Sequence, residues 1–323
     1  MPLGEFDLIA KYFTRPVKRA TLGIGDDCAL LPPAPGVGIQ WAVSSDMLVD
    51  GRHFLSTVAP HKLGHNAQAV HLSDQAACGA TTRAVTLALA LPRVDESFLQ
   101  GFSEGLFALA DETGCELVGG DTTQGPLNIC ITVFGEVPTG QALLRSGARA
   151  GDDLYVSGTV GDARLALEAF RGTVVLERAD FDAARRAMEQ PQPRVALGQA
   201  LRGVASSAID VSDGLLGDLA HILRRSGVGA QVHVDAVPRS AAVGRQPLAW
   251  QRTCTLAGGD DYELVFTAAP RDADAVHAAA RLAGVPVTRF GVIEAGSGLR
   301  LVDRERRPVD NRFGSFDHFN AAE

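Results

Sequence analysis

Aspartates recur in this sequence at one kind of position, where an apolar stretch meets a turn of glycine or serine residues. The stretch LGIGDDCALL places Asp26 and Asp27 directly after a Gly-x-Gly turn. The same arrangement returns further along the chain at Asp46, Asp121, Asp210, Asp213, Asp260 and Asp261. A single aspartate of this kind is typical of a turn or a helix cap. Their repetition instead favours a shared site that binds cations.

Asp74 differs from the other aspartates because the pattern around it is helical. An apolar row at helical spacing runs through Leu63, Ala67, Val70, Asp74 and Ala77, so the carboxylate lies on the inward stripe. An ionised carboxylate there is costly unless a cation or a hydrogen-bond donor meets it. Two explanations are open: an arginine or a helix end beside the carboxylate, or a bound metal ion, which we favour.

Carboxylates gathered in one pocket need cations to hold them together. Two of them about 4 Å apart repel by about 4 kcal/mol at an effective dielectric constant of about 20. Carboxylate oxygens suit hard ions, above all Mg²⁺, which keeps water ligands and bridges to substrate phosphates. Zinc is disfavoured because no histidine and cysteine ligand spacing occurs. The pattern therefore predicts several Mg²⁺ ions that hold a polyphosphate.

The composition excludes several classes of protein. The chain has only three lysines, Lys11, Lys18 and Lys62, and no G-x-x-x-x-G-K-[ST] motif, which excludes a P-loop. The net charge of −8 argues against a nucleic-acid surface. Five scattered cysteines without a C-x-x-C pair indicate reduced thiols. No apolar run approaches the roughly 18 residues of a membrane helix, and the N-terminus lacks a signal-peptide core, so we expect a cytoplasmic protein.

Strand-like and helix-like segments alternate along all 323 residues. In the first half the patterns predict helices over 6–13, 61–80 and 95–113 and strands over 39–48, 84–92, 115–123 and 127–137. In the second half they predict strands over 154–161, 230–237 and 253–269 and helices over 162–171, 194–204 and 272–283. Turn residues indicate a linker over 138–153. The alternation predicts a mixed α/β (α+β) fold with two domains, 1–139 and 140–323.

Several motifs occur in one order along nearly the whole chain, namely GEFDLI, LGIGDDCALL, SSDMLVDGRHF, HLSDQAACGA, LVGGDTT, RSGARAGD, AIDVSDGLLGDL, GGDDYEL and FGSFDHF. This collinear set resembles the thiamine-monophosphate kinase family, part of the ATP-binding superfamily named for aminoimidazole-ribonucleotide synthetase. The resemblance implies an N-terminal dimerising sheet domain that binds ATP and Mg²⁺, and a C-terminal α/β domain that completes the site. It also implies a homodimer that transfers the γ-phosphoryl group of ATP in line to thiamine monophosphate, giving thiamine diphosphate and ADP.

Matching motif positions imply the functional residues of this chain. The implied metal ligands are Asp27, Ser44, Ser45, Asp46, Asp74, Asp121, Asp210 and Asp213. Among them, the implied catalytic residues are Asp46, Asp121 and Asp213. The implied ATP contacts are Gly120, Asp121, Arg145 and Ser212. The implied contacts with thiamine monophosphate are His53, Asp260 and Phe316.

Two positions depart from the pattern of the family, and three implied contacts have ordinary alternatives. Asp260 stands where the family usually has glutamate, and Thr113 stands where it often has a tyrosine near the nucleotide. Arg145 offers a planar fork for phosphate, but a solvated linker arginine also fits the sequence. Phe316 either offers its face to the cationic thiazolium or docks the chain end. His53 either donates to phosphate or serves its own loop.

Two other functions fit part of this pattern: another ATP-using synthetase of the superfamily, or a non-catalytic nucleotide-binding dimer. A selenophosphate synthetase would carry a reactive cysteine or selenocysteine and a lysine in a mobile glycine-rich arm. Lys11 and Lys18 lie outside any such arm. A protein that only binds nucleotide would not need acids in every motif. We therefore expect a kinase that works without a covalent enzyme intermediate.

Overall fold

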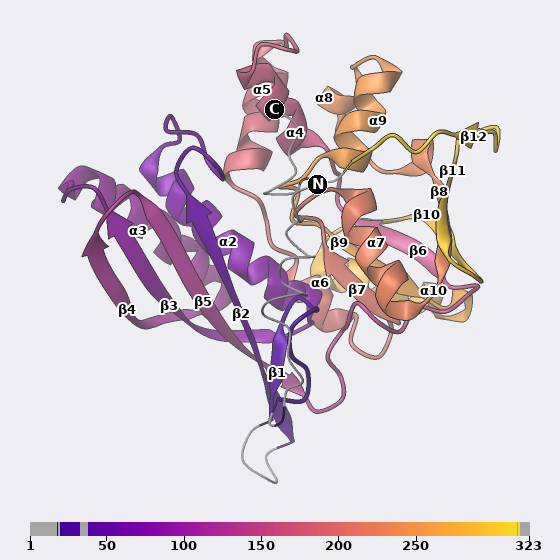
Figure 1. Cartoon of the computed structure of the whole chain (residues 1–323), viewed down its shortest axis with the longest axis horizontal. Coiled ribbons are helices and arrows are strands. Elements are labelled where there is room, and N and C mark those ends of the chain that lie inside the picture. The colour runs from indigo at the N-terminus through magenta and orange to yellow at the C-terminus, as the bar shows by residue number, and fades with distance from the viewer. Residues whose placement is uncertain (1–17, 19, 33–37, 315, 317–323) are drawn as a thin grey trace, which may run out of the picture.

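The computed structural model describes residues 18, 20–32, 38–314 and 316 of the chain. Two β-sheets with their helices lie side by side (Figure 1). Residues 29–138 build the first sheet with its helices, and residues 153–309 build the second. The mixed α/β fold predicted from the alternating patterns is confirmed. The helix predicted over 6–13 lies outside the described residues.

The first sheet has the strand order β1-β2-β5-β3-β4. Its strands are β1 (Ala29–Leu31), β2 (Ile39–Val49), β3 (Thr81–Leu91), β4 (Glu116–Gln124) and β5 (Asn128–Pro138). Helices α2 (Pro60–Ala77) and α3 (Glu96–Thr113) cover one face. β3 and β4 are parallel because α3 crosses between them, and the other neighbouring strands are antiparallel. The elements predicted between residues 39 and 137 are confirmed, with bounds shifted by a few residues.

The second sheet has the strand order β12-β11-β8-β10-β6-β9-β7. Its strands are β6 (Asp153–Ser157), β7 (Ser207–Asp210), β8 (Gly229–His233), β9 (Leu264–Ala268), β10 (Val287–Glu294), β11 (Gly298–Val302) and β12 (Pro308–Val309). The helices around it are α4 (Asp162–Phe170), α5 (Arg178–Glu189), α6 (Val195–Ala200), α7 (Leu215–Ser226), α8 (Ala241–Gly244), α9 (Leu248–Ala257) and α10 (Ala273–Ala283). Two short 3-10 helices span Val234–Ala236 and Pro270–Asp272.

The strand predicted over 253–269 is wrong in its first half. Residues 253–257 belong to helix α9, and β9 begins only at Leu264. The run Thr-Cys-Thr-Leu has the period of a strand, but Cys254, Thr255 and Leu256 are all buried in the helix. Two glycines then end the helix before the loop to β9. Helix α5 was not predicted because its sequence is mostly polar and buries only Ala184 and Glu189.

Helix α2 belongs to the cores of both sheets. Its residues Leu63 and Val70 pack in the core of the first sheet, whereas Ala76 and Ala77 pack in a core formed with the second. The helix contacts both α6 and β7. Asp74 lies between these two groups of residues along the helix. The packing of α2 therefore carries this carboxylate to the junction of the two sheets.

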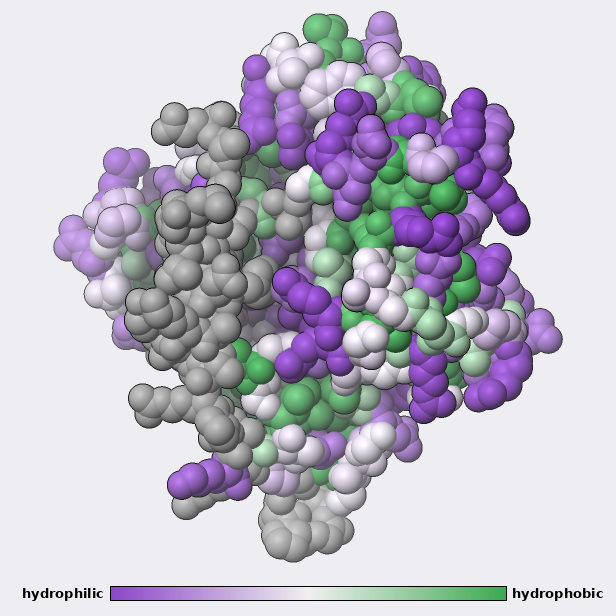
Figure 2. All heavy atoms as spheres, turned by 45° about the vertical axis from the view of Figure 1, so that its right-hand side comes forward, coloured by the Kyte–Doolittle hydropathy of each residue, from purple (hydrophilic) through white to green (hydrophobic). Residues whose placement is uncertain are grey.

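The helices, the visible surface and the cysteines of the described residues can be compared with what the composition predicts. None of the helices in residues 38–314 combines the length and the apolar character that crossing a bilayer requires. On the face seen in Figure 2, hydrophilic residues surround small hydrophobic areas. All five cysteines are free thiols, and four of them are buried.

Candidate functional site

Three carboxylates converge where the two sheets meet. Oxygens of Asp27, Asp74 and Asp210 all lie within 4.8 Å of one another. Asp27 precedes β1, Asp74 lies on α2, and Asp210 ends β7, so the cluster depends on segments from both halves of the chain. Asp27 and Asp210 are almost fully buried, with 7% and 4% of their surface exposed. The fold thus concentrates negative charge in a place that water reaches poorly.

Arg145 neutralises one side of this cluster. Its guanidinium donates from Nε and Nη2 to the two oxygens of Asp27, each at 3.0 Å. Its backbone N–H donates to both oxygens of Asp26, at 3.1 and 3.2 Å. Asp26 therefore fixes the backbone of the arginine while Asp27 holds its side chain. The guanidinium is largely buried, unlike that of a solvated linker arginine.

Two serines hold the other carboxylates of the cluster. The hydroxyl of Ser73 donates to Oδ2 of Asp210 at 2.6 Å. The hydroxyl of Ser44 donates to Oδ2 of Asp74. These donors orient the carboxylates but bring no positive charge, so they leave the repulsion between the acids in place.

The cluster carries more negative charge than its surroundings balance. Burial, followed by the charge of Asp46, raises the pKa of Asp74 well above its usual range. Burial and the charge of Asp27 raise the pKa of Asp210 to about 8. Burial and the same neighbour raise the pKa of Asp26 to about 6. A set of oxygen donors that lowers its repulsion and ionises fully only beside positive charge fits a hard divalent cation such as Mg²⁺.

Strand β2 brings Ser44 and Asp46 to the cluster but turns Ser45 away from it. Side chains alternate along the strand, so Ser44 and Asp46 share one face and Ser45 points to the other. The negative charge of Asp46 is the second cause, after burial, of the raised pKa of Asp74. The hydroxyl of Ser45 lies 3.0 Å from Oγ1 of Thr132 on the opposite face. Only the backbone of Ser45 can face the acids of its own chain.

Asp121 lies far from the cluster of its own chain. Strand β4 is three strand positions from β2, which is about 14 Å at the usual spacing. Asp121 pairs with Ala88, and this row continues through Cys130 to Met47. Its side chain therefore shares the face of Met47 and not that of the neighbouring Asp46. The residue is also exposed.

Gly120 lets strand β4 run close to its neighbour. The residue has a φ of 149°, and a Cβ there would lie 1.9 Å from the carbonyl oxygen of Leu87. Only glycine tolerates both conditions. Like Asp121, it is exposed, so its backbone is open to a nucleotide.

The loop after β7 joins two groups of predicted site residues. It carries Ser212 and Asp213, and its carbonyl oxygens accept backbone hydrogen bonds from two other segments. Asp260 donates to Ser212 at 2.8 Å, and Phe316 donates to Asp213 at 3.0 Å. A Cβ on Gly259 would lie 2.3 Å from the carbonyl oxygen of Ser212, so only glycine permits this approach. Residues predicted to touch ATP thus lie beside residues predicted to touch the substrate.

Tyr262 connects Asp260 with the core of the first sheet. Its ring packs in that core, and its hydroxyl donates to Oδ1 of Asp260 at 3.3 Å. Burial and the charge of Asp260 raise the pKa of the tyrosine. Asp260 keeps solvent access, yet the protein around its carboxyl group raises its pKa to about 6. Both residues have positive φ, 61° and 50°, a strained conformation that often occurs at functional sites.

The turn after β2 reaches Phe316 near the end of the chain. Nδ1 of His53 accepts the backbone N–H of Val49 at 3.0 Å, which leaves Nε2 to carry the proton of the neutral ring. The guanidinium of Arg52 lies 4.7 Å from the centre of the Phe316 ring. One aromatic face at this place already attracts a cation.

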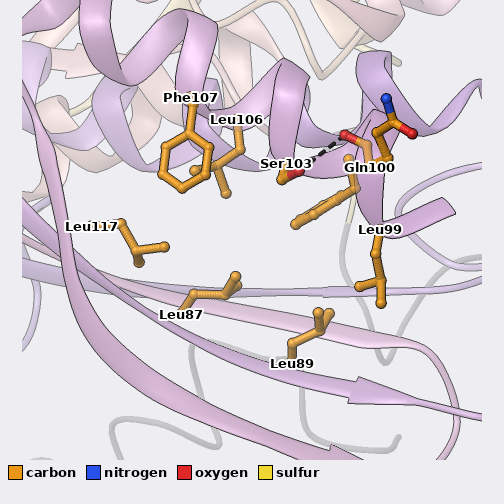
Figure 3. A pocket seen from close by; sticks show the side chains of 9 residues that line it. Leu87, Leu89, Leu99, Gln100, Ser103, Leu106, Phe107 and Leu117 are labelled. Atoms are coloured by element: carbon orange, nitrogen blue, oxygen red, sulfur yellow. Dashed lines mark hydrogen bonds between the residues drawn. The ribbon is translucent and has the colours of Figure 1, made fainter. Parts of the chain in front are cut away.

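Helix α3 takes part in a separate, apolar environment. The hydroxyl of Thr113 donates to the carbonyl oxygen of Leu109 at 2.8 Å and so bonds within its own helix. A pocket of about 320 Å³ lies between α3 and the outer strands, where Leu106 and Phe107 face Leu117 (Figure 3). None of the residues that line it is charged. The side chains that line this pocket therefore offer no charge to phosphate or metal ions.

Known protein families match both halves of the chain. Residues 25–137 match the AIR synthase related protein, N-terminal domain, and residues 149–304 match the corresponding C-terminal domain. A thiamine-monophosphate kinase of Salmonella typhimurium is 46% identical over an aligned length of 330, which covers 99% of each chain. The chain belongs to the thiamine-monophosphate kinase family. It is therefore an enzyme of the kinase class, which removes the non-catalytic dimer from consideration.

Solved structures of this kinase family share the fold. The thiamine-monophosphate kinase from Stenotrophomonas maltophilia K279a is 44% identical, with a TM-score of 0.79 and coverage of 88% of this chain and 91% of that chain. AaThiL, solved in complex with AMPPCP and TMP, is 28% identical, with a TM-score of 0.82 and coverage of 98% and 97%. The structure of that relative contains AMPPCP and TMP together.

Two residues that support the candidate site were not among those predicted from the sequence. Ser73 lies next to Asp74 in the motif HLSDQAACGA but points to a different carboxylate, that of Asp210. Tyr262 lies in GGDDYEL and supports Asp260. Both belong to motifs already recognised, so the signal was present. A local pattern does not reveal their roles, because the partner of Ser73 lies 137 residues away and the role of Tyr262 depends on the burial of its ring.

Proposed function

We propose that this kinase transfers the γ-phosphoryl group of ATP to thiamine monophosphate, directly and in line, with several Mg²⁺ ions held by aspartates. The observation that carries the proposal is the convergence of Asp27, Asp74 and Asp210 at the junction of the two sheets. Phosphoryl transfer needs positioning and charge neutralisation more than covalent chemistry. A buried set of acids supports this role in a chain without a P-loop lysine.

The residues around the cluster divide the work of binding the nucleotide. The ions are held by Asp27, Ser44, Asp46, Asp74, Asp210 and Asp213, and by the backbone of Ser45. When bound, Mg²⁺ supplies positive charge to the phosphates and to the charge that spreads over the transferred group. Arg145 binds Asp27 through Nε and Nη2, and from the edge of the cluster it offers a phosphate the guanidinium N–H groups that Asp27 does not take. Ser212 contacts the nucleotide from the loop after β7.

The substrate side of the site is formed by the turn after β2 and the segments beside the loop after β7. Phe316 offers an aromatic face to the permanently cationic thiazolium. The contact of Arg52 with this ring supports the role, because the guanidinium and the thiazolium are both cations that the face of an aromatic ring attracts. His53 donates from Nε2 to the phosphate of thiamine monophosphate, and Asp260 orients the substrate. The complex of AaThiL with AMPPCP and TMP supports this choice of ligands.

Gly120 and Asp121 act across the interface of a homodimer in this proposal. Asp121 is exposed and about 14 Å from β2 of its own chain, with its side chain on the other face of the sheet. A second copy can bring it to a complete site, so that the partner's Asp121 joins Asp46. We also propose a domain division between residues 139 and 140, since the first sheet ends at Pro138. For the whole protein we propose a cytoplasmic location.

One assay tests the proposed reaction. Purified protein supplied with ATP, MgCl₂ and thiamine monophosphate should form thiamine diphosphate and ADP, separated and quantified by chromatography. Thiamine without a phosphate should be a poor acceptor, because the site places donors for that phosphate. Failure to form thiamine diphosphate over a wide range of Mg²⁺ concentrations would contradict the proposal.

A further inference from the structure

Asp218 gathers the backbone of the loop that carries the predicted nucleotide residues. It lies in the first turn of α7 and is buried, with 4% of its surface exposed. Its Oδ2 accepts the backbone N–H groups of Ser212, Asp213 and Gly214, at 3.1, 3.2 and 3.1 Å. Three successive peptide groups thus point to one carboxylate oxygen. The orientation of these peptide planes depends on a side chain outside the loop.

The other side of the same loop holds the substrate residues. The carbonyl oxygens of Ser212 and Asp213 accept the backbone N–H groups of Asp260 and Phe316. Turning a peptide plane moves its N–H and its carbonyl together, because the peptide group is planar. Asp218 therefore controls the acceptors on which both substrate residues depend. The same rotation would move the side chains of Ser212 and Asp213.

We propose that Asp218 is a positioning residue for phosphoryl transfer. It keeps the residues predicted to contact the nucleotide aligned with those predicted to contact the substrate. It does not touch either ligand: its carboxylate is turned to the backbone of the loop. The N–H groups that it binds are withheld from phosphate, so the loop presents side chains and carbonyl oxygens to the site. The inference rests on the proposed function, since it concerns the alignment of ATP with thiamine monophosphate.

Three substitutions separate positioning from simple support of the fold. Asp218→Ala removes the acceptor and should lower kcat by about 100-fold, with a smaller rise in KM, because small misplacements of reacting groups are costly. Asp218→Glu keeps the acceptor but displaces it by one methylene, and should lower kcat by about 10-fold while the chain stays folded. Asp218→Asn keeps an acceptor oxygen at the same place, so its kcat should stay within about fivefold of the wild type.

Asp303 provides the matched control. It is also a buried carboxylate that organises a loop, and it accepts the backbone N–H groups of Glu305 and Arg307 at 2.9 Å each. It lies between β11 and β12, at the edge of the second sheet away from β7. Asp303→Ala should lower thermal stability and leave kcat within about twofold of the wild type.

Binding of AMPPCP with Mg²⁺, measured by calorimetry, gives a readout that needs no turnover. Asp218→Ala and Asp218→Glu should bind the analogue at least several-fold more weakly than the wild type, and Asp218→Asn should bind it about as well. Wild-type kcat and binding in Asp218→Ala and Asp218→Glu would overturn the proposal, as would an equal loss of kcat in Asp303→Ala. If the wild type failed to use thiamine monophosphate, the proposed function would fall, and the AMPPCP measurement would still decide the role of Asp218.

Discussion

The carboxylate cluster and strand β4 place the same residue type in opposite surroundings. At the cluster, Asp27, Asp74 and Asp210 are packed within 4.8 Å of one another and held by Arg145 and two serines. On β4, Asp121 stands exposed at the outer edge of a sheet. The carboxylates of the cluster repel one another in the folded chain, which lowers its stability, whereas the exposed carboxylate of Asp121 does not destabilise a separate chain. Under the proposed function, a cation would complete the first region and a second chain would complete the other.

The largest effect is expected from removing one charge of the cluster. Under the proposed function, Asp210→Asn should lower kcat by about 1000-fold, because it removes a carboxylate ligand of the Mg²⁺ ions that neutralise the reacting phosphates. The same change relieves repulsion, so the thermal midpoint of the chain in EDTA should rise. Asp303→Asn, outside the cluster, is the control and should change kcat by less than about twofold. An Asp210→Asn enzyme with nearly wild-type kcat would show that the cluster is only structural.

Mixing two inactive variants tests the role of Asp121. Asp46→Asn and Asp121→Asn should each abolish turnover while the chain stays folded. If the partner's Asp121 joins Asp46, a mixed dimer contains one site with both acids intact. Equal mixing and subunit exchange should then restore about a quarter of the wild-type rate, since half of the dimers are mixed and each has one working site of two. A mixture as inactive as its components would place both acids in one chain's site.

Two neighbouring serines give a smaller, matched contrast. Ser44→Ala removes the hydroxyl that donates to Asp74 and should lower kcat by about 10-fold, the usual effect of losing a hydrogen bond to a charged group. Ser45→Ala removes a hydroxyl on the opposite face and should change kcat by less than about twofold. Steady-state kinetics at saturating Mg²⁺ compares them. Equal losses would mean that the faces of β2 are assigned wrongly.

The smallest expected effect is a dependence of stability on pH in the metal-free chain. The carboxyl groups of Asp26 and Asp210 have a pKa of 3.8 in the unfolded chain, and the fold raises these pKa values to about 6 and about 8. The unfolded state therefore releases protons first, and stability is lost as pH rises through this window. Thermal unfolding in EDTA should give a lower midpoint at pH 8 than at pH 6, and Mg²⁺ should reduce the difference. A midpoint that rises from pH 6 to pH 8 contradicts the account.

Local patterns in the sequence predicted much of the fold and part of the site. The helical spacing around Asp74 correctly placed it on the inward side of α2, because that period depends only on nearby residues. Most strands and helices follow from the same kind of signal. The exception at Cys254 and Leu256 arose because a short period-two run fits a strand and a buried helix alike.

The rest of the site depends on partners that a local pattern cannot reveal. Ser45 and Asp121 stand in motifs like those of the cluster, yet strand order and register put their side chains on another face. Arg145 was a candidate for phosphate, but its bond to Asp27 depends on a segment 118 residues earlier. Motif position indicates which residues matter, and only the packing of the two sheets decides which of them meet.

Counting bound metal ions tests the central claim most directly. Mn²⁺ can replace Mg²⁺ at oxygen sites, and electron paramagnetic resonance distinguishes the free ion from the bound one. In the presence of AMPPCP, the wild-type enzyme should bind several Mn²⁺ ions per chain, and Asp74→Asn should bind fewer, or bind them much more weakly, while its fold is unchanged. An Asp74→Asn enzyme that binds as many ions with the same affinity would contradict the assignment of this cluster as the metal site.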